Sequence, residues 1–331
     1  MPELTGVLLV VVALALLFDF SNGWHDSANA IATVVSTRAV SPIMAVTGAG
    51  ILNILGAYMS TAVAKTVGSG LVEPMAVTQA VVASALAGAI VWNLITLLLG
   101  LPTSSSHALI GGLVGAAVMH GGWQVVKLTG LRSVLEAMVL SPILGFGIGL
   151  TLMVLISWAF FRASRGWATA LFRRLQIVSA SFMAFSHGAN DAQKAMGIIT
   201  LAMLSSGVIT SPEVPTWVIA SCAMAMGLGT AAGGWRIVRT LGMRIVKLEP
   251  VHGFAAETGA AAVLLATAHL GLPVSTTHTI TTTVMGVGAV KRLSAVRWGV
   301  TAKIVFAWLC TLPGAALLAG GVYLLLSRLM G

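Results

Sequence analysis

Charged side chains are scarce in this sequence. Lys, Arg, Asp and Glu make up only 8% of the 331 residues, and hydrophobic residues make up 57%. An ordinary soluble domain has roughly 25% charged residues, because its surface faces water. This composition excludes a protein built mainly of water-soluble domains.

Cysteine is also nearly absent, and several common signatures are missing. Cys222 and Cys310 lie far apart in apolar segments, which argues against a disulfide framework or a metal cluster. Residues 1–6 contain no Lys or Arg, so we expect the first apolar segment to be a true helix rather than a cleaved signal peptide. The sequence has no G-x-S-x-G and no H-E-x-x-H pattern, so we do not expect an enzyme such as an intramembrane hydrolase.

Long apolar runs are what the sequence does contain. They include 7–18, 81–99, 139–161 and 300–326. Many of the apolar runs reach the roughly 20 residues that a helix needs to cross a bilayer. The sequence therefore predicts an all-α polytopic membrane protein.

Two polar motifs occur twice, in the same order, inside these apolar segments. Residues 20–30 align without gaps to 185–195, and residues 101–107 align to 272–278. Matching polar residues within two separate apolar blocks are hard to obtain by chance. We therefore predict an internal repeat of about half the chain.

The loop charges predict how the two halves are oriented. If the N-terminus is outside, most loop Lys and Arg fall inside, as the positive-inside rule requires. The second half then starts from the opposite face, so the repeat is inverted and both termini are outside. This bias explains much of the net charge of +9, and no nucleic-acid partner is expected. The predicted first half, 1–161, contains a broken helix 4–37 and a hairpin 75–119. A basic cytoplasmic connector, 162–175, follows it. The predicted second half, 176–331, contains a broken helix 176–206 and a hairpin 251–290.

Ionisable residues lie inside both copies of the first motif. Asp26 in the first copy corresponds to Asp191 in the second. An ionised carboxylate at the bilayer centre costs roughly 2.5 to 3.5 kcal/mol, so such residues normally face a cavity or a partner. Lys194 lies three residues after Asp191 and can pair with it on one helix face, but Asn29 holds the Lys194 position in the first half. Gly23 and Gly188 precede the aspartates, and since Gly weakens a helix, we expect a broken first helix in each half.

The second motif predicts a hairpin tip in each half. Pro102 and Pro273 each begin the pattern Pro-x-Ser/Thr-Ser/Thr-Ser/Thr-His, in which three consecutive hydroxyl residues precede a His. Pro suits the first turn of a helix. Hydroxyls and free backbone N–H groups at a helix N-terminus form an anion site.

Together, these motifs resemble the inorganic phosphate transporter (PiT) family of bacterial low-affinity permeases and sodium-phosphate symporters. The resemblance rests on 22–38, 102–107, 186–194 and 273–278, and it covers essentially the whole chain. It implies an inverted-repeat helical transporter that forms a homodimer in the bacterial cytoplasmic membrane, in contact with lipid. His25 stands where many members have Asn, which is similar to the proton-linked branch and leaves sodium coupling open.

The resemblance implies contacts with phosphate and coupling ions at the two motifs, and the neighbouring polar residues extend this set. Glu257 has no acidic counterpart in the first half, so it is either a functional acid or a partner for a nearby base. The expected substrate-binding residues are Asp26, Asn29, Ser104, Ser105, Ser106, Asp191, Gln193, Lys194, Ser275, Thr276 and Thr277. The expected coupling-ion residues are Asp19, Asn22, Asp26, Asn190, Asp191 and Glu257.

Phosphate is an anion, and two ionised aspartates would repel it by several kcal/mol at close range in a low-dielectric cavity. A cation must therefore enter with it. The alternatives are sodium at Asp26 and Asp191, protons on the carboxylates, or a neutral metal-phosphate complex. We expect a phosphate symporter that works by alternating access and has no cofactor besides the coupling cation; the alternative is a permease for sulfate or another oxyanion.

Overall fold

The computed structural model describes residues 6–73, 77–272 and 274–330, and these residues are almost entirely helical. Residues 4–5 of the predicted first helix, 75–76 of the first hairpin and Pro273 of the second tip lie outside this part of the chain. The α-helices are α1 (Gly6–Ser36), α2 (Pro42–Ala57), α3 (Ala62–Ser69), α4 (Gln79–Leu99), α5 (Ser105–Gly121), α6 (Leu128–Ala159), α7 (Arg165–Ser205), α8 (Thr216–Ala232), α9 (Trp235–Arg239), α10 (Pro250–His269), α11 (Thr276–Ala289) and α12 (Trp298–Met330). A π-helix, η3 (Thr240–Arg244), continues α9, and short 3₁₀ turns η2 (Trp123–Val125) and η4 (Leu293–Ala295) precede α6 and α12.

The all-helical membrane fold predicted from the sequence is confirmed. Among the described residues, 5 helices, α1, α4, α6, α10 and α12, are long and apolar enough to cross a membrane, or up to 6 if the pair formed by α8 and α9–η3 is one span bent by 58°. Large apolar side chains remain exposed on the outer helices, as on α6 and α12. A helix surface of this kind is suited to lipid rather than to water.

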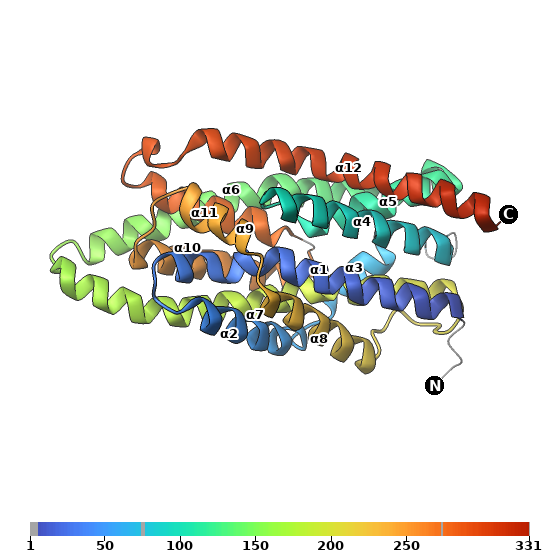
Figure 1. Ribbon diagram of the computed structural model, residues 1–331, viewed down its shortest axis with the longest axis horizontal. Helices are drawn as coiled ribbons and strands as arrows, with labels where there is room; N and C mark the ends of the chain where they lie inside the picture. Colours follow the sequence, from blue (N-terminus) through green and yellow to red (C-terminus); the bar gives the residue numbers. More distant parts are fainter. Residues whose placement is uncertain (1–5, 74–76, 273, 331) are drawn as a thin grey trace.

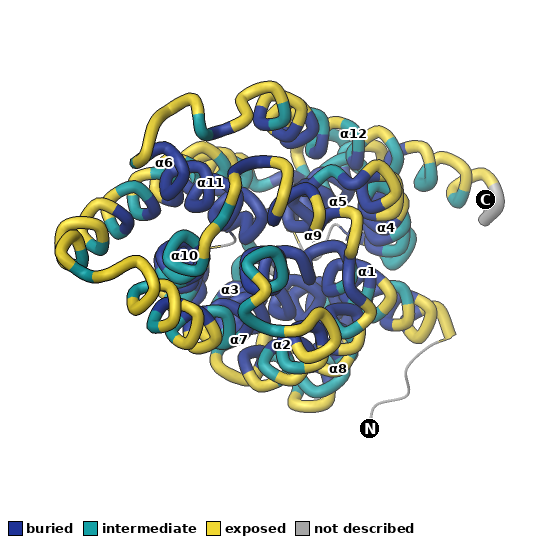
Figure 2. The backbone as a smooth tube through the Cα atoms, turned by 60° about the vertical axis from the view of Figure 1, so that its left-hand side comes forward, coloured by how far each residue is buried: buried dark blue, intermediate teal, exposed yellow. Residues whose placement is uncertain are grey.

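Several of the closest helix contacts join the two halves of the chain. α1 packs on α8, and α7 packs on α2. In the same way α5 packs along α12, and α11 packs along α6. Figure 2 shows α1, α2, α7 and α8 on one side of the molecule and α5, α6, α11 and α12 on the other. This reciprocal pairing is what an inverted repeat would produce, although the repeat itself stays a prediction.

The first helix of each half is continuous, which differs from the broken helices that we expected. α1 runs without interruption through Asn22 and Gly23, and α7 runs through His187 and Gly188. The two glycines instead leave room for neighbouring helices. A Cβ at Gly23 would overlap the backbone of α8, and a Cβ at Gly188 would overlap the backbone of α2 at Asn53. They allow close helix crossings, and tertiary packing outweighs the weak helix propensity of glycine.

The connector also differs from its expected form. α7 begins at Arg165 with Ser164 as its N-cap residue. Most of the segment 162–175 is therefore the first part of a long helix, and only a short loop separates α6 from α7. The two predicted hairpins correspond to α4 with α5 and to α10 with α11, and α5 extends to Gly121, beyond the predicted end at residue 119.

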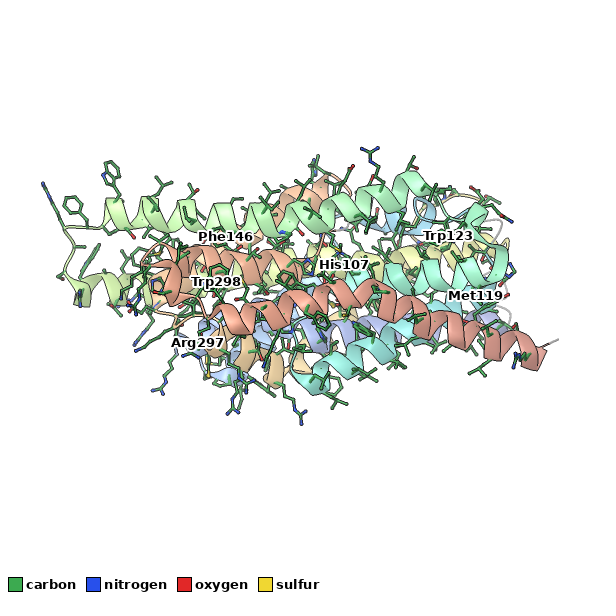
Figure 3. All side chains as sticks on the ribbon, turned by 90° about the horizontal axis from the view of Figure 1, so that it is seen from above. His107, Met119, Trp123, Phe146, Arg297 and Trp298 are labelled. Carbon is green, nitrogen blue, oxygen red and sulfur yellow. The ribbon has the colours of Figure 1, made fainter. Side chains whose placement is uncertain are left out.

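The hairpin tips reach the interior of the molecule. α4 ends at Gly100, whose φ of 66° is a left-handed conformation that favours glycine. α5 then begins at Ser105, and Figure 3 places His107 near the middle of the long axis, whereas Met119 and Trp123 lie toward one end and Arg297 toward the other. The tip of this hairpin therefore lies deep within the helical bundle.

Candidate functional site

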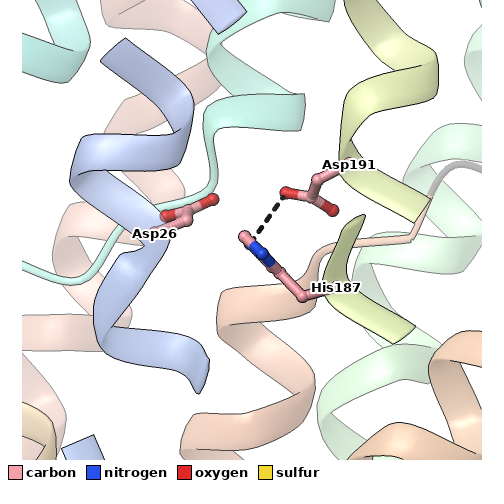
Figure 4. Close-up of side chains that lie close together, drawn as sticks. All are labelled: Asp26, His187 and Asp191. Atoms are coloured by element: carbon pink, nitrogen blue, oxygen red, sulfur yellow. Dashed lines mark ion pairs between the residues drawn. The ribbon is translucent and has the colours of Figure 1, made fainter. Parts of the chain in front are cut away.

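Two long helices bring the paired aspartates together at the centre of the molecule. Asp26 on α1 and Asp191 on α7 lie beside His187, and one ligand atom from each of the three side chains falls within 4.8 Å of the others. Figure 4 shows the three side chains converging, with the ion pair between His187 Nε2 and Asp191 Oδ2 at 3.6 Å. Two carboxylates and an imidazole form a donor set that can hold a cation.

Asp26 is surrounded by hydrogen-bond donors from three helices. Ser105 Oγ lies 2.6 Å from Asp26 Oδ2, and Thr277 Oγ1 lies 3.2 Å from Oδ1. His25 Nδ1 is 2.8 Å from the same Oδ1 and holds its other ring nitrogen 3.0 Å from Thr96 Oγ1. The tips of both hairpins therefore contact this one carboxylate.

Asp191 has a similar environment, in which Lys194 takes the place that His25 has beside Asp26. Thr276 Oγ1 donates to Asp191 Oδ1 at 2.6 Å, and Lys194 Nζ lies 2.7 Å from the same oxygen. The intrahelical ion pair with Lys194 is therefore present. It does not exclude a binding role, because Asp191 also contacts the hairpin tip just as Asp26 does.

The three hydroxyls in each tip have different partners. The first, Ser104 or Ser275, is the N-cap of its helix and accepts the backbone N–H of the His three residues later at 3.2 Å. The second, Ser105 or Thr276, contacts the aspartate of its own half. The third differs between the halves: Thr277 accepts from Asn29 Nδ2 at 2.9 Å, whereas Ser106 lies 3.5 Å from the carbonyl of Val274.

Other predicted residues lie at or near this cluster. Asn22 Oδ1 accepts a hydrogen bond from Ser105. Asn190 is buried, and neither of its polar atoms has a hydrogen-bond partner among the described residues. Asp19 lies two turns before Asp26 on α1, is fully buried, and has both carboxylate oxygens unpartnered within the described part of the chain. A buried carboxylate with so few hydrogen bonds is costly, so Asp19 is suited to hold a proton or a cation.

Two predicted residues are placed elsewhere. Gln193 Oε1 accepts the backbone N–H groups of Val63 at 2.8 Å and Ala64 at 3.3 Å, so its amide caps α3 instead of facing the aspartates. Glu257 accepts hydrogen bonds from Thr33 and Ser179, and from Gln176 Nε2 at 3.2 Å. Glu257 thus joins α10 to α1 and α7 in a second buried polar cluster, with hydroxyl and amide donors around it rather than a base.

Several residues of the site were missed by the sequence reasoning. Asn53 on α2 lies 2.7 Å from His187 Nδ1, and Thr96 and Thr103 lie beside His25 Nε2. Asn53 and Thr96 are single polar residues within apolar helices, and that isolation is the signal by which they could have been noticed, whereas Thr103 directly precedes the hydroxyl run of the first tip. Their partners were not predictable, because the partners lie in distant parts of the sequence.

Aromatic rings connect the two tips to each other and to α12. The rings of His107 and His278 meet edge to face at 4.9 Å, and His278 stacks on Trp308 of α12 at 3.9 Å. Trp308 Nε1 donates to the carbonyl of Pro102 at 2.8 Å. The two tips are therefore held against each other and against α12.

The site is closed to solvent and carries charges of both signs. The substrate-binding residues predicted from the sequence are at most 2% exposed, Asp26 and Ser106 being the most accessible. Carboxylates can hold cations, while hydroxyls, Lys194 and amides can hold an oxyanion. Ionisable residues that are buried between membrane helices and can hold both cations and an oxyanion are typical of a membrane transporter for ions.

Comparison with known proteins agrees with this class. A family profile described as "Phosphate transporter family" matches residues 22–171 and 163–319. A Rhizobium meliloti protein described as "Probable low-affinity inorganic phosphate transporter" is 49% identical over 319 residues, covering 96% of each chain. A Bacillus subtilis protein of the same description is 43% identical over 324 residues, covering 97% of each chain. A solved structure described as "The sodium-dependent phosphate transporter" has a TM-score of 0.90 at 27% identity and covers 97% of this chain and 99% of its own.

The chain therefore belongs to the phosphate transporter family, as the motifs indicated. Family and relatives are transporters, so the expectation that the protein is not an enzyme is confirmed.

Proposed function

We propose that this protein carries inorganic phosphate across the bacterial cytoplasmic membrane together with a cation, by alternating access. The observation that carries this proposal is the pair of aspartates, each bound by a tip hydroxyl at 2.6 Å, in one buried cluster with Lys194. The names of the relatives and of the similar solved structure, which refer to phosphate and to sodium, support the substrate and a coupling cation.

Phosphate binds between the two aspartates and the two tips in this proposal. The hydroxyls of Ser105, Thr276 and Thr277 and the ammonium of Lys194 donate to its oxygens. These donors then give up their hydrogen bonds to the aspartates and donate to phosphate instead. The carboxylates released in this way are free to accept the hydrogen of a protonated phosphate and to hold the coupling cation.

The coupling cation binds at Asp26, His187 and Asp191 in this proposal. The repulsion between an anion and two carboxylates is offset only if a positive charge enters with it. Sodium, protons and a divalent metal bound to phosphate all meet that requirement. Asp19, Asn22 and Asn190 extend the cation site along α1 and α7, and Glu257 is a more distant acid that links α10 to both helices.

Uptake into liposomes containing the purified protein tests this function. Labelled phosphate is supplied outside, and proton and sodium gradients are imposed separately, with and without a divalent metal. Accumulation of phosphate above its external concentration under one of these gradients is the expected result. Uptake that responds to neither gradient and to no metal would reject symport.

Competition by sulfate tests the substrate. Sulfate has no hydrogen to donate at neutral pH, so it cannot satisfy Asp26 or Asp191 as a protonated phosphate can. We expect sulfate to compete poorly with labelled phosphate. Equal competition would instead favour a general oxyanion permease.

Two structural features remain proposals. The chain is an inverted repeat, which the reciprocal packing of α1 on α8 and α7 on α2 supports. Both termini lie outside, which the distribution of loop Lys and Arg supports. A homodimer is implied by the family resemblance, and the mass of the purified protein in detergent, corrected for bound detergent, tests it.

A further inference from the structure

Two short helical segments occupy equivalent places in the two halves. α3 follows α2 and precedes the first hairpin, whereas α9–η3 follows α8 and precedes the second hairpin. The site residues described above lie on other elements. Each of them contacts the opposite half of the chain at two points close to the site.

The N-terminus of α3 is fastened to α7 beside Asp191. Gln193, two residues after this aspartate, accepts the N–H groups of Val63 at 2.8 Å and Ala64 at 3.3 Å. Its own Nε2 donates to the carbonyl of Ala189 at 2.5 Å, which fixes the orientation of the amide. These bonds satisfy N–H groups that the first turn of a helix leaves free.

The same short helix is fastened to the tip of the second hairpin. Thr66 Oγ1 donates to the carbonyl of Gly271 at 2.8 Å, just before the tip hydroxyls. Gly271 has a φ of 69°, which glycine adopts without strain. Since Thr276 of this tip donates to Asp191, α3 spans the contact between the tip and α7.

The segment α9–η3 repeats this arrangement around Asp26. Ser27, the next residue, accepts the N–H of Gly234 at 2.6 Å at the start of α9. Thr240 Oγ1 donates to the carbonyl of Gly100 at 2.8 Å, just before the first tip. Ser105 of that tip contacts Asp26 in turn. The π-helical turn at Thr240 fits such a role, because π-helical turns occur frequently at functional sites.

We propose that α3 and α9–η3 are two latches, each holding one hairpin tip against the aspartate that it contacts. The four positioning residues are Gln193 and Thr66 for Asp191, and Ser27 and Thr240 for Asp26. α3 and α9 lie on opposite sides of the middle of the long axis (Figure 1). One latch can therefore open toward one side of the membrane while the other stays closed, as alternating access requires. This inference rests on the proposed function, since it assigns roles around the same site.

Removal of each latch hydroxyl tests the proposal. Thr66→Val and Thr240→Val delete the hydrogen bond to the tip with little change in volume. The closed geometry that binds phosphate becomes less populated, so the apparent KM for phosphate should rise about fivefold while kcat does not fall. Thr66→Ser and Thr240→Ser keep the hydroxyl and should restore the KM.

Thr200→Val is the matched control. Thr200 is buried on α7, and its hydroxyl donates at 2.8 Å to Met196 of the same helix. The KM of the Thr200→Val variant should equal that of the unchanged protein. An unchanged KM in both Thr66→Val and Thr240→Val, or a Ser variant that fails to restore the KM, would overturn the proposal that these segments are latches. Absence of phosphate transport by the unchanged protein would instead count against the proposed function.

Hydrogen exchange provides a readout that needs no variant. Phosphate with its coupling cation should slow exchange of the backbone amides in α3 and in α9–η3, because occupancy of the site holds both tips in place. Exchange in the outer part of α6 should not change. Equal exchange rates in α3 and α9–η3 with and without phosphate would contradict the proposal, even if a latch variant failed to fold.

Discussion

At the scale of single residues, neighbouring hydroxyls in one tip have different physical roles. Ser104 and Ser275 cap helices, whereas Ser105 and Thr276 contact aspartates. The sequence assigned all of them to the substrate, because a run of hydroxyls looks uniform. Only the direction of each side chain separates a cap from a ligand contact.

Alanine substitutions should separate these two roles. Ser104→Ala removes a cap, so it should lower the unfolding free energy by about 1 kcal/mol and lower Tm. Ser105→Ala should raise the KM for phosphate several-fold, since it removes one donor to the oxyanion, with a smaller change in Tm. Thermal unfolding in detergent and transport kinetics measure the two effects. The reverse pattern, with Tm lowered mainly by Ser105→Ala, would show that the two hydroxyls are wrongly assigned.

The aspartates should be required for transport and not for insertion. Asp26→Asn and Asp191→Asn keep the side-chain volume but remove the charge that holds the cation. Loss of a hydrogen bond to a charged group costs about 1.5 to 3 kcal/mol, so uptake should fall at least about tenfold in each variant. Glu136→Gln is the control, because Glu136 is an exposed acid that pairs with Arg132 on α6. Uptake at normal rates by both aspartate variants would end their proposed role.

At the scale of helices, the sequence predicted the hairpins and motif positions well and the helix continuity poorly. The apolar runs and the repeated Pro and hydroxyl motifs are local signals, so they could be read directly. The effect of Gly188 depends on Asn53 of α2, which is its neighbour in space but distant in sequence. Gln193 was taken for a ligand contact for the same reason, since nothing in its own segment reveals that it caps α3. Glu257 has no acidic counterpart in the first half, and its hydrogen-bond donors could not be predicted because they lie on other helices.

The glycine crossings give a prediction for helix packing. A Cβ at Gly188 would lie 2.5 Å from Asn53 Cα, so Gly188→Ala forces α7 and α2 apart. Overpacking of this kind costs about 1 to 3 kcal/mol, and Tm in detergent should fall. Gly166→Ala on the same helix is the control, because nothing lies within 4 Å of that position. Equal Tm values for the two variants would indicate that the crossing is looser than described.

At the scale of the whole molecule, neither half is arranged to pack alone. α1 lies against α8, and the first hairpin lies against α12, so each half buries its helices on the other. The start of α1 and the end of α12 lie at the same end of the long axis (Figure 1). Arg297 lies toward the opposite end (Figure 3). This arrangement supports both termini outside and the basic loops inside.

Tagged termini test that orientation. A protease-cleavable tag at either end should be removed by protease added outside intact cells. A cysteine replacing exposed Ser294, in the basic loop before α12, should react with a membrane-impermeant reagent only after the cells are opened. Cleavage of the tags only in opened cells would reverse the predicted orientation.

The central claim is that the aspartates of both halves and the two tips jointly bind an oxyanion with its counter-ion. The most direct test is the Kd of phosphate for the purified protein, measured over a range of proton, sodium and divalent-metal concentrations. Binding of the two ions is reciprocal, so the Kd should fall as the coupling cation increases, and Asp26→Asn or Asp191→Asn should abolish this dependence. A Kd that is the same at every cation concentration, or a dependence that survives in both variants, would contradict the claim.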